Sequence, residues 1–534
     1  MKAKLIRAEA NPSQDLILEK VAELDPIEVF SDLLLTQSFV TEGEIHRAFL
    51  SKGVATPASL VEAIASHDDT LRLYDSVTQE EVGWTLCSIR AQEKAIVARA
   101  DALESSRKHE IGIRFIRVVA RNMTLDEEQT DAMRHVLDAG CLKILEGRAG
   151  TGKSHTLSAI RQVAEKDGYE VIGLAPTNAV AQDLRDSGFG RATTVHSLLW
   201  YRDHAPEHAN AKVASKSLIV VDEAAMLDTQ RLDALTQLAV DTGAKLVLVG
   251  DDRQLASIER GGIFSVVRER VGSAALTSVR RQHQEWARQA SRGFSEGQFS
   301  EGLEAYDAHG LIHWRDDLEA ARVALLERWE ADTEAGRGTR FVFAYTNDEV
   351  RQLNDAMQAI EIARGRVRDC ITLETERGTL SVGAGDRVAF RGTWKQKGIY
   401  AGSLATVEVI DGDRVTVRSD RGRMITFDTR EFTNIDLGYA GTIYRGQGKT
   451  LDQTYLLHTH HWRDAASYVA MTRARGQTEV FVGRDQASGL PELADQMRRQ
   501  SDRGATLQYA TQDELVAHQR PQREHSLGRD GPER

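Results

Sequence analysis

The stretch from Leu142 to Ser154, LKILEGRAGTGKS, constrains the fold of this chain more than any other. An apolar run breaks into glycines and ends in a lysine and a hydroxyl, with Gly147, Gly152 and Lys153 at fixed positions of the pattern G-x-x-x-x-G-K-[ST]. Glycines let backbone N–H groups surround a phosphate, and a helix beginning at Lys153 points its positive end at the same anion. The pattern therefore predicts a buried strand, a phosphate-binding loop and a helix.

The loop predicts a nucleotide with a triphosphate and Mg²⁺. Lys153 would reach the β- and γ-phosphates, and the Ser154 hydroxyl would bind the Mg²⁺. The loop residues expected to contact the nucleotide are Gly147, Ala149, Gly150, Thr151, Gly152, Lys153 and Ser154.

Length and composition set the outer bounds. A chain of 534 residues is too long for one core and predicts three or four domains. Its 41% apolar and 28% charged residues are typical of a soluble globular protein. The net charge of −12 argues against a global basic surface, although a cleft can concentrate a few Arg and Lys around a polyanion.

Cysteine usage and hydropathy concern the compartment. Cys87, Cys141 and Cys370 are widely spaced and odd in number, which disfavours a disulfide framework or a zinc site. No apolar run approaches the length of a membrane span, and the N-terminus turns polar too soon for a signal peptide. We expect a cytoplasmic protein without a membrane segment.

Short apolar runs alternate with helical patterns after the loop. EVIGLAP, SLIVVDE and KLVLVGD, at 170–176, 217–223 and 245–251, are rich in Val, Ile and Leu and predict strands of a parallel sheet. Ligands bind at the carboxyl ends of such strands. The polar residues at these ends are Thr177, Asn178, Asp222, Glu223 and Asp251.

Four polar residues have a predicted role beside the loop. Asp222, after an apolar strand, is placed to bind Mg²⁺, and Glu223 can orient and deprotonate an attacking water; an acidic helix cap is the alternative. Gln254 in GDDRQL is suited to contacting the γ-phosphate. Gln129 can pair with both N6 and N7 of adenine and would select ATP; a solvent-exposed helix glutamine is the alternative.

Seven stretches resemble the motifs of a known family. They are GRAGTGKS, LAPTNAVAQDL, VVDEAAML, VGDDRQL, SVRRQ, GTIYRGQGKTLD and YVAMTRAR. In this order they resemble superfamily-1 helicases of the RecD-like branch, and the helicase portion of conjugative relaxases of the TraA type, including VFAYTNDEVRQLN at 342–354. The motifs span about residues 124 to 485, whereas fold analogy alone would not suffice.

The resemblance implies an α/β fold of two RecA-like P-loop lobes with parallel sheets and ATP between them. Lobe 1 would span 119–275, and lobe 2 would combine 276–365 with 436–488. Arg281 and Arg473 would act as arginine fingers, because a planar guanidinium spreads positive charge over phosphoryl oxygens; a surface or ion-paired arginine is the alternative for each. Gly448 would also contact the nucleotide.

Residues 366–435 differ in character from both lobes. Apolar and polar residues alternate between Gly and Asp-Gly turns, which predicts a small antiparallel barrel. The resemblance implies an SH3-like barrel inserted at this place. Trp394 with Arg391, Lys395 and Lys397 forms a basic and aromatic edge suited to stacking bases and contacting phosphates; solvated hairpin residues are the alternative.

The two ends of the chain carry no predicted chemistry. Residues 1–118 show helical spacing, with a capping box at Thr41 and Glu44. This helical N-terminal accessory domain could be winged-helix-like or a plain helical packing domain. Residues 489–534 have mixed charge and few apolar residues, which predicts a partly disordered tail.

The resemblance also implies contacts with a nucleic-acid strand from both lobes. Relatives usually carry His, Lys and a small residue before the Gln-Gly, whereas this chain has Tyr444-Arg445-Gly446. Tyr and Arg can still stack and pair, so we expect binding to be kept. Besides Trp394, the residues expected to contact the strand are Thr177, Asn178, His196, Thr442, Tyr444 and Gln447.

His458, His460 and His461 form a cluster that could suggest the metal site of a nickase. The cluster lies late in the chain on a predicted strand of lobe 2, and the sequence offers no separate nicking domain or tyrosine-rich N-terminal segment. We interpret it as part of the lobe, so the resemblance extends to the motor and not to the nickase.

Together these features predict an ATP-dependent DNA helicase or translocase, 5′-to-3′ by family analogy, in conjugative DNA transfer or DNA processing. Its cofactors would be ATP and Mg²⁺. Its partners would be single-stranded DNA or a tailed duplex, and a relaxase or a conjugation or repair complex. Two alternatives stay open: an ATP-switched DNA-binding or assembly subunit without unwinding activity, and an RNA-directed motor, since these motifs do not read sugars.

Overall fold

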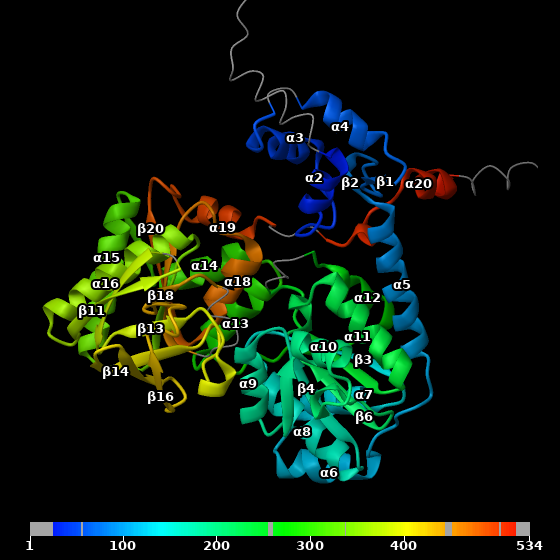
Figure 1. The fold of residues 1–534 in the computed structure, drawn as a ribbon, viewed down its shortest axis with the longest axis horizontal. Coiled ribbons are helices and arrows are strands. Elements are labelled where there is room, and N and C mark those ends of the chain that lie inside the picture. Colours follow the sequence, from blue (N-terminus) through cyan, green and yellow to red (C-terminus); the bar gives the residue numbers. More distant parts are fainter. Residues whose placement is uncertain are drawn as a thin grey trace, which may run out of the picture.

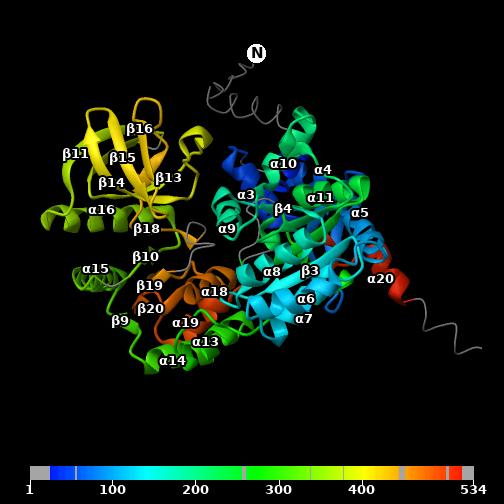
Figure 2. The same cartoon turned by 90° about the horizontal axis from the view of Figure 1, so that it is seen from below.

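The computed structural model describes residues 25–54, 57–254, 260–336, 338–376, 378–443, 451–500 and 504–519. They form two α/β lobes with parallel sheets, an antiparallel insert and an N-terminal module (Figure 1). The lobes lie side by side, and the insert rises from lobe 2 on the side seen at the upper left of Figure 2.

Lobe 1 contains, in the described part of the chain, a six-stranded sheet in which every neighbouring pair is parallel. Its order is β5-β4-β6-β7-β3-β8, with β3 (Leu142–Gly147), β4 (Glu170–Ala175), β5 (Arg191–Thr194), β6 (Ser217–Val221), β7 (Lys245–Gly250) and β8 (Ala274–Leu276). All residues of β6 and β7 are buried, which fits their apolar character after the first residue of each strand. The predicted strands at 170–176, 217–223 and 245–251 are confirmed.

Helices cover both faces of this sheet. They are α6 (Ile113–Asn122), α7 (Glu127–Leu137), α8 (Lys153–Lys166), α9 (Asn178–Asp186), α10 (Val195–His204), α11 (Thr229–Thr242) and α12 (Ile263–Val271). Two separate hydrophobic clusters, one on each side of the strands, form the core of the lobe. The crossovers put the loops after β3, β4, β6 and β7 at one edge of the sheet.

Lobe 2 contains a five-stranded parallel sheet among the residues described, in the order β18-β10-β19-β20-β9. Its strands are β9 (Ile312–Arg315), β10 (Arg340–Phe343), β18 (Ala440–Gly441), β19 (Leu451–His458) and β20 (Ala474–Gly483). Its helices are α13 (Glu285–Ser295), α14 (Phe299–Ala308), α15 (Leu318–Glu334), α16 (Asn347–Ala363), α18 (Asp464–Thr472) and α19 (Leu490–Arg498).

The insert between α16 and β18 is antiparallel, as its alternating pattern predicted. Its main sheet has the order β16-β15-β14-β13-β17, and β11 pairs with β12 in a hairpin. The strands are β11 (Arg368–Thr375), β12 (Gly378–Ala384), β13 (Arg387–Phe390), β14 (Leu404–Asp411), β15 (Arg414–Ser419), β16 (Met424–Asp428) and β17 (Ile435–Leu437), with a short helix η3 (Lys395–Lys397).

The root of the insert is fixed to lobe 2 by a buried carboxylate. Asp386 accepts hydrogen bonds from the Tyr439 hydroxyl (2.6 Å), the Gln358 amide (2.7 Å) and the Gly383 N–H (2.7 Å). Burial raises the pKa of Asp386, and these three donors oppose that rise. Because Gln358 lies on α16, the network ties both ends of the insert to lobe 2.

The N-terminal module is not purely helical. Three helices, α2 (Pro26–Leu33), α3 (Glu42–Ser51) and α4 (Ala58–Ala65), are followed by a hairpin of β1 (Thr70–Tyr74) and β2 (Glu81–Leu86) and by α5 (Cys87–Glu104). The capping box of Thr41 and Glu44 is confirmed. Three helices followed by a hairpin resemble the winged-helix-like alternative more than the plain helical one.

The chain after residue 488 is ordered over much of its described length, where the sequence predicted a tail. Helix α19 packs Leu493, Ala494 and Met497 into the core of lobe 2. Residues 504–516 then lie along α5, where buried Glu93 accepts hydrogen bonds from Thr506 and Leu507. Sequence composition alone did not indicate these partners, because Glu93 lies more than 400 residues upstream.

The described part of the chain contains no helix whose length and hydropathy would suit a bilayer crossing.

Candidate functional site

The loop between β3 and α8 has the geometry of a phosphate cradle. Gly150 and Gly152 adopt left-handed φ angles of 78° and 86°, which L side chains rarely take. A Cβ on Gly150 would lie 2.7 Å from Cβ of Arg281, and one on Gly152 would lie 2.7 Å from Nε2 of Gln129. Glycine is therefore required at both positions by conformation and by close neighbours.

Lys153 bridges two carboxylates at the carboxyl end of β6. Its Nζ lies 3.2 Å from Oδ1 of Asp222 and 3.1 Å from Oε1 of Glu223. Burial opposes the charge on this lysine, but the two carboxylates raise the pKa of Lys153. Burial raises the pKa of Asp222. Burial also opposes the charge of Glu223, but the charges of Lys153, Arg473 and Arg281 and the hydrogen bond from Lys153 together lower the pKa of Glu223.

Glu223 has an unusual backbone. Its φ of 53° lies in the left-handed region, which is uncommon for a residue other than glycine, and its N–H donates to Oδ1 of Asp222 (2.9 Å). Left-handed residues of this kind often lie at functional sites, where the surrounding fold holds the strain. The turn brings the Glu223 carboxylate back toward Lys153.

Gln254 and Arg473 meet in the same cleft from different lobes. Arg473, at the end of α18, donates to Oε1 of Gln254 (3.1 Å), and Nε2 of Gln254 donates to Oδ2 of Asp251 (2.9 Å). All three side chains are buried. Arg281 donates to the carbonyl of Thr472 (2.8 Å), so it lies against the same end of α18.

The positive charges of Arg281 and Arg473 lie close together in a buried site. Burial, together with the nearby Arg473 charge, lowers the pKa of Arg281 to about 9. Burial also lowers the pKa of Arg473. A bound anion would relieve both costs, so this pair favours a phosphate group between the lobes.

The cleft encloses a volume of about 450 Å³. Its walls include the exposed Ser154 hydroxyl, the Asp222 carboxylate and the side chains of Arg280, Arg281 and Arg475. Hydroxyl, carboxylate and phosphate oxygens are the ligands that Mg²⁺ prefers. The residues present therefore fit a nucleoside triphosphate with Mg²⁺, held by Ser154 and Asp222.

Gln129 lies beside the loop and is buried, not exposed as the alternative required. Asp126 caps α7 by accepting the Gln129 N–H (2.8 Å), and Asp126 also forms an ion pair with Arg280. The side-chain amide reaches Gly152 at one end of the cleft. This position is compatible with a base of the nucleotide at that end.

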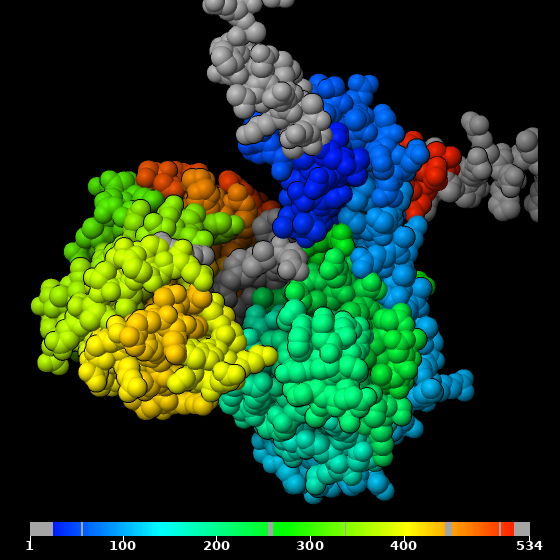
Figure 3. All heavy atoms as spheres, in the orientation of Figure 1, coloured from blue at the N-terminus to red at the C-terminus, as the bar shows by residue number. Residues whose placement is uncertain are grey.

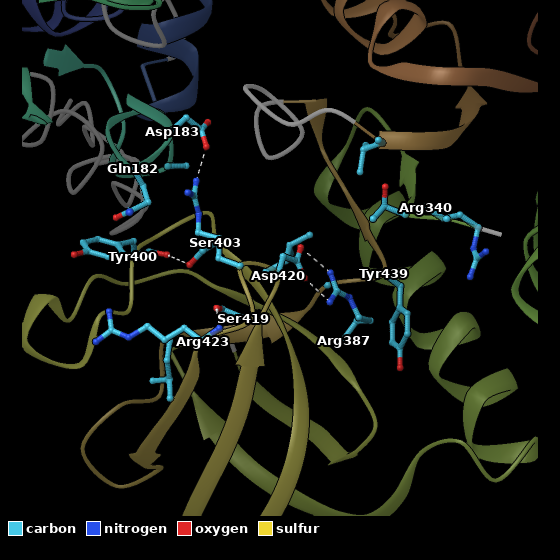
Figure 4. A pocket seen from close by; sticks show the side chains of 18 of the residues that line it. Gln182, Asp183, Arg340, Arg387, Tyr400, Ser403, Ser419, Asp420, Arg423 and Tyr439 are labelled. Atoms are coloured by element: carbon cyan, nitrogen blue, oxygen red, sulfur yellow. Dashed lines mark hydrogen bonds and ion pairs between the residues drawn. The ribbon is translucent and has the colours of Figure 1, made fainter. Parts of the chain in front are cut away.

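A larger chamber of about 1010 Å³ lies between α9, lobe 2 and the insert. Figure 4 shows Tyr400, Arg387 and Arg423 of the insert and Arg340 of lobe 2 around it. The insert closes the chamber by reaching across to lobe 1, where Arg421 forms ion pairs with Asp183 and Asp186 of α9. The yellow insert and the green surface of lobe 1 meet in Figure 3.

Among the described residues expected to contact a nucleic acid, one lines this chamber. Asn178 lines it, and its amide donates to Oγ1 of Thr393 in the insert (3.5 Å). Thr177 caps α9 by accepting the Val180 N–H (3.4 Å), so its hydroxyl has a structural role. His196 is exposed on α10, and Thr442 follows β18.

Trp394 precedes η3 at the edge of the insert. Its ring stacks on Phe432, and Nζ of Lys397 lies 5.6 Å from its centroid. Lys395, in the same turn, donates to Oγ of Ser197 at the start of α10 (3.4 Å). Tyr444, Gln447 and Gly448 lie outside the described residues.

Sequence reasoning missed several residues of the cleft. Tyr468 belongs to the quoted motif YVAMTRAR, but only Arg473 of that motif was assigned a role. Arg148 of the loop donates to Oε1 of Glu296 (2.9 Å) and Oγ of Ser295 (3.1 Å), which links the loop to α13.

His458 of the histidine cluster is buried and forms a hydrogen bond with Gln496 (2.8 Å), and burial lowers the pKa of His458 to about 4.

The fold and the cleft define a P-loop protein of two α/β lobes with arginines facing the phosphate loop. Residues 124–317 match a family model described as an AAA domain. The chain is related to the superfamily-1 helicases of the TraA and RecD type, as its motifs indicated.

Two relatives illustrate this relationship. The conjugal transfer protein TraA of Rhizobium radiobacter is 30% identical over 394 residues, which cover 73% of this chain and 35% of that protein. The ATP-dependent RecD2 DNA helicase of Deinococcus radiodurans is 30% identical over 382 residues, covering 66% and 48%. The chain thus spans less than half the length of either relative.

A solved structure of Pif1 helicase from Bacteroides in complex with ADP-AlF3 and ssDNA aligns with a TM-score of 0.47 at 20% identity. The alignment covers 68% of this chain and 94% of that chain.

Proposed function

We propose that this chain is an ATP-dependent motor that moves along single-stranded DNA and unwinds duplex DNA. The observation that carries the proposal is the convergence of Lys153, Glu223 and Gln254 of lobe 1 with Arg473 of lobe 2 on one cleft. Because catalytic groups come from both lobes, hydrolysis would require the cleft between them to close. Each round of hydrolysis would therefore change the distance between the lobes.

The side chains divide the work of hydrolysis. Lys153 and Arg281 neutralise phosphate charge, and Arg473 adds positive charge as it builds up on the γ-phosphoryl oxygens. Ser154 and Asp222 would hold Mg²⁺, which would supply further positive charge opposite the phosphates. Glu223 accepts the proton of the attacking water. The pKa of Glu223 is lowered, so its carboxylate is ionised at neutral pH, as that of an ordinary glutamate is.

The chamber beside the insert is the proposed path of the DNA strand. Its arginines and Tyr400 supply phosphate contacts and a stacking surface. Trp394, which forms a β-bridge with Ile399 beside Tyr400, adds a second ring near that surface. We assign the insert to the SH3-like barrels and both lobes to the RecA-like class. The strand would cross Asn178 and Thr442, with Tyr444 and Gln447 completing the contact.

We infer the direction and the biological setting by analogy with the helicase family that the motifs resemble. We propose 5′-to-3′ movement, and a role in conjugative DNA transfer or DNA processing beside a relaxase or a repair complex. The TraA and RecD2 names of the relatives support this setting.

The test measures ATP hydrolysis with no polymer, with single-stranded DNA and with single-stranded RNA, followed by unwinding of 5′- and 3′-tailed duplexes. We expect hydrolysis stimulated by DNA and unwinding of the 5′-tailed duplex. Stimulation by DNA without any unwinding would favour the switched DNA-binding subunit, and stronger stimulation by RNA would favour the RNA motor. No nucleotide hydrolysis under any condition would refute the motor.

A further inference from the structure

Tyr468 connects the two lobes at the phosphate loop. It lies on α18 of lobe 2, and only 2% of its surface is exposed. Its hydroxyl accepts the N–H of Ala149 in the loop (2.9 Å) and donates to Oδ2 of Asp251 after β7 (2.8 Å). One oxygen from lobe 2 therefore joins two separate loops of lobe 1.

The same carboxylate continues the chain of hydrogen bonds. Oδ2 of Asp251 also accepts from Nε2 of Gln254 (2.9 Å), and Oε1 of Gln254 accepts from the Arg473 guanidinium (3.1 Å). Arg473 follows α18, the helix that carries Tyr468. The chain of hydrogen bonds thus starts in lobe 2 at Tyr468, continues through Asp251 and Gln254 of lobe 1 and ends in lobe 2 at Arg473.

Each member of this chain is buried and has a fixed role as donor or acceptor. Burial and the neighbouring Asp251 charge raise the pKa of Tyr468 well above its usual value, so the hydroxyl keeps its proton and donates. Gln254 can accept from Arg473 only if its amide nitrogen faces Asp251. The position of Asp251 therefore sets the orientation of Gln254.

We propose that Tyr468 is a positioning residue for ATP hydrolysis, whose hydroxyl holds the Asp251–Gln254 turn and Arg473 in register with the phosphate loop. This inference rests on the proposed function. Tyr468 touches neither the water nor the phosphate in this scheme. It acts by fixing Asp251, and so the amide and the guanidinium that face the γ-phosphate.

The hydroxyl can be removed without removing the ring. The ring of Tyr468 belongs to the hydrophobic core of lobe 2, and Tyr468→Phe keeps that packing. The variant leaves the Ala149 N–H without its acceptor and Asp251 without one of its donors. A buried polar group that is left unpaired is unfavourable. In this site the effect would appear as a displaced Gln254.

The experiment compares the full-length wild type with Tyr468→Phe and with Tyr306→Phe as a matched control. Tyr306 is equally buried in the same core, and its hydroxyl donates to the carbonyl of Met471 on α18 (3.3 Å), which is not a member of the chain of bonds. For Tyr468→Phe we expect kcat of DNA-stimulated ATP hydrolysis to fall about tenfold with KM for ATP within about twofold. Tyr306→Phe should retain the wild-type kcat.

Gln254→Ala provides a second readout that a purely structural role would not change. If Tyr468 acts through Gln254, adding Tyr468→Phe to Gln254→Ala should lower kcat by less than about twofold, because the shared step is already lost. Binding of a fluorescent ADP analogue and the melting temperature should stay near the wild-type values in Tyr468→Phe.

Three results would overturn the proposal: an unchanged kcat in Tyr468→Phe, an equal loss in Tyr306→Phe, or multiplicative losses in the double variant. If Tyr468→Phe does not fold, Asp251→Ala removes the oxygen that accepts from both Tyr468 and Gln254, and it must show the same loss of kcat. If the wild type hydrolyses ATP and Tyr468→Phe has the same kcat, only this inference is refuted. If the wild type does not hydrolyse ATP, the proposed function is refuted as well.

Discussion

Lobe 1 makes contacts in the nucleotide cleft that differ from its contacts with the insert. In the cleft, the Tyr468 hydroxyl and the Arg473 guanidinium form buried hydrogen bonds to lobe 1. At the insert, Arg421 pairs with Asp183 and Asp186 in partly exposed ion pairs, with side-chain exposures of 40%, 45% and 56%. The two contacts join the same lobes, directly or through the insert, by different physical means.

The difference indicates different tasks. Buried hydrogen bonds are directional and costly to leave unmade, so they fix one geometry. Exposed ion pairs contribute about 0–1 kcal/mol and weaken with salt, so they can break and reform. We expect the cleft to impose a single catalytic arrangement, and the ion pairs between the insert and α9 to break and reform.

The largest effect should come from breaking the cleft at Lys153. Lys153→Ala removes the charge that reaches the phosphates and leaves Asp222 and Glu223 facing each other without a cation. We expect ATP hydrolysis to fall at least about 100-fold. Single-stranded DNA should still bind, because no contact at the insert changes. Steady-state hydrolysis and a DNA-binding titration check this, and substantial hydrolysis by the variant would contradict the site.

Glu223→Gln should produce a loss of similar order with a different signature. The amide keeps the size of the side chain and its place beside Lys153, but it cannot accept a proton. We expect ATP to bind and hydrolysis to fall about 100-fold. Single-turnover hydrolysis and equilibrium nucleotide binding separate the two steps. Asp252→Asn is a suitable control, because Asp252 pairs with Arg268 outside the cleft. Loss of ATP binding together with hydrolysis would count against a role as base.

The cleft was the part of this molecule most open to prediction from sequence. The loop between β3 and α8 depends on glycine and lysine spacing over a few residues, and Asp222 and Glu223 follow a strand whose burial is visible in its composition. The role of Tyr468 was not predictable in this way, because the bond from Ala149 joins residues 319 positions apart. Such a contact exists only once α18 docks on lobe 1.

The flanking regions show why composition misled. The hairpin of β1 and β2 exposes charged residues such as Arg72 and Glu81. Because of these charges, and because helical spacing precedes the hairpin, its alternation of apolar and polar residues did not stand out in the sequence. The polar segment at 504–516 has too few apolar residues for a core of its own. It is ordered by hydrogen bonds to Glu93 and Arg90, whose burial against it could not be read from local sequence.

At the insert, Trp394→Ala should weaken DNA binding and leave the cleft intact. Loss of a stacking ring costs about 1–3 kcal/mol per base, so we expect the Kd for single-stranded DNA to rise about tenfold. Hydrolysis at saturating DNA should stay within about twofold of the wild type. Trp394→Phe keeps a flat ring and should restore most of the affinity. Equal affinity for all three proteins would remove Trp394 from the DNA path.

The smallest effect should come from Arg421→Ala, which breaks the insert's ion pairs to α9. Loss of at most about 1 kcal/mol corresponds to a change of no more than about fivefold in the rate of DNA release. Because the pairs are exposed, the difference from the wild type should shrink as salt is raised. Stopped-flow release of labelled single-stranded DNA at low and high salt measures this. Arg430→Ala is the matched control, since Arg430 pairs with Asp428 within the insert (2.7 Å). A larger effect that persists at high salt would mean that the insert is clamped to lobe 1, and the contrast between the two contacts would not hold.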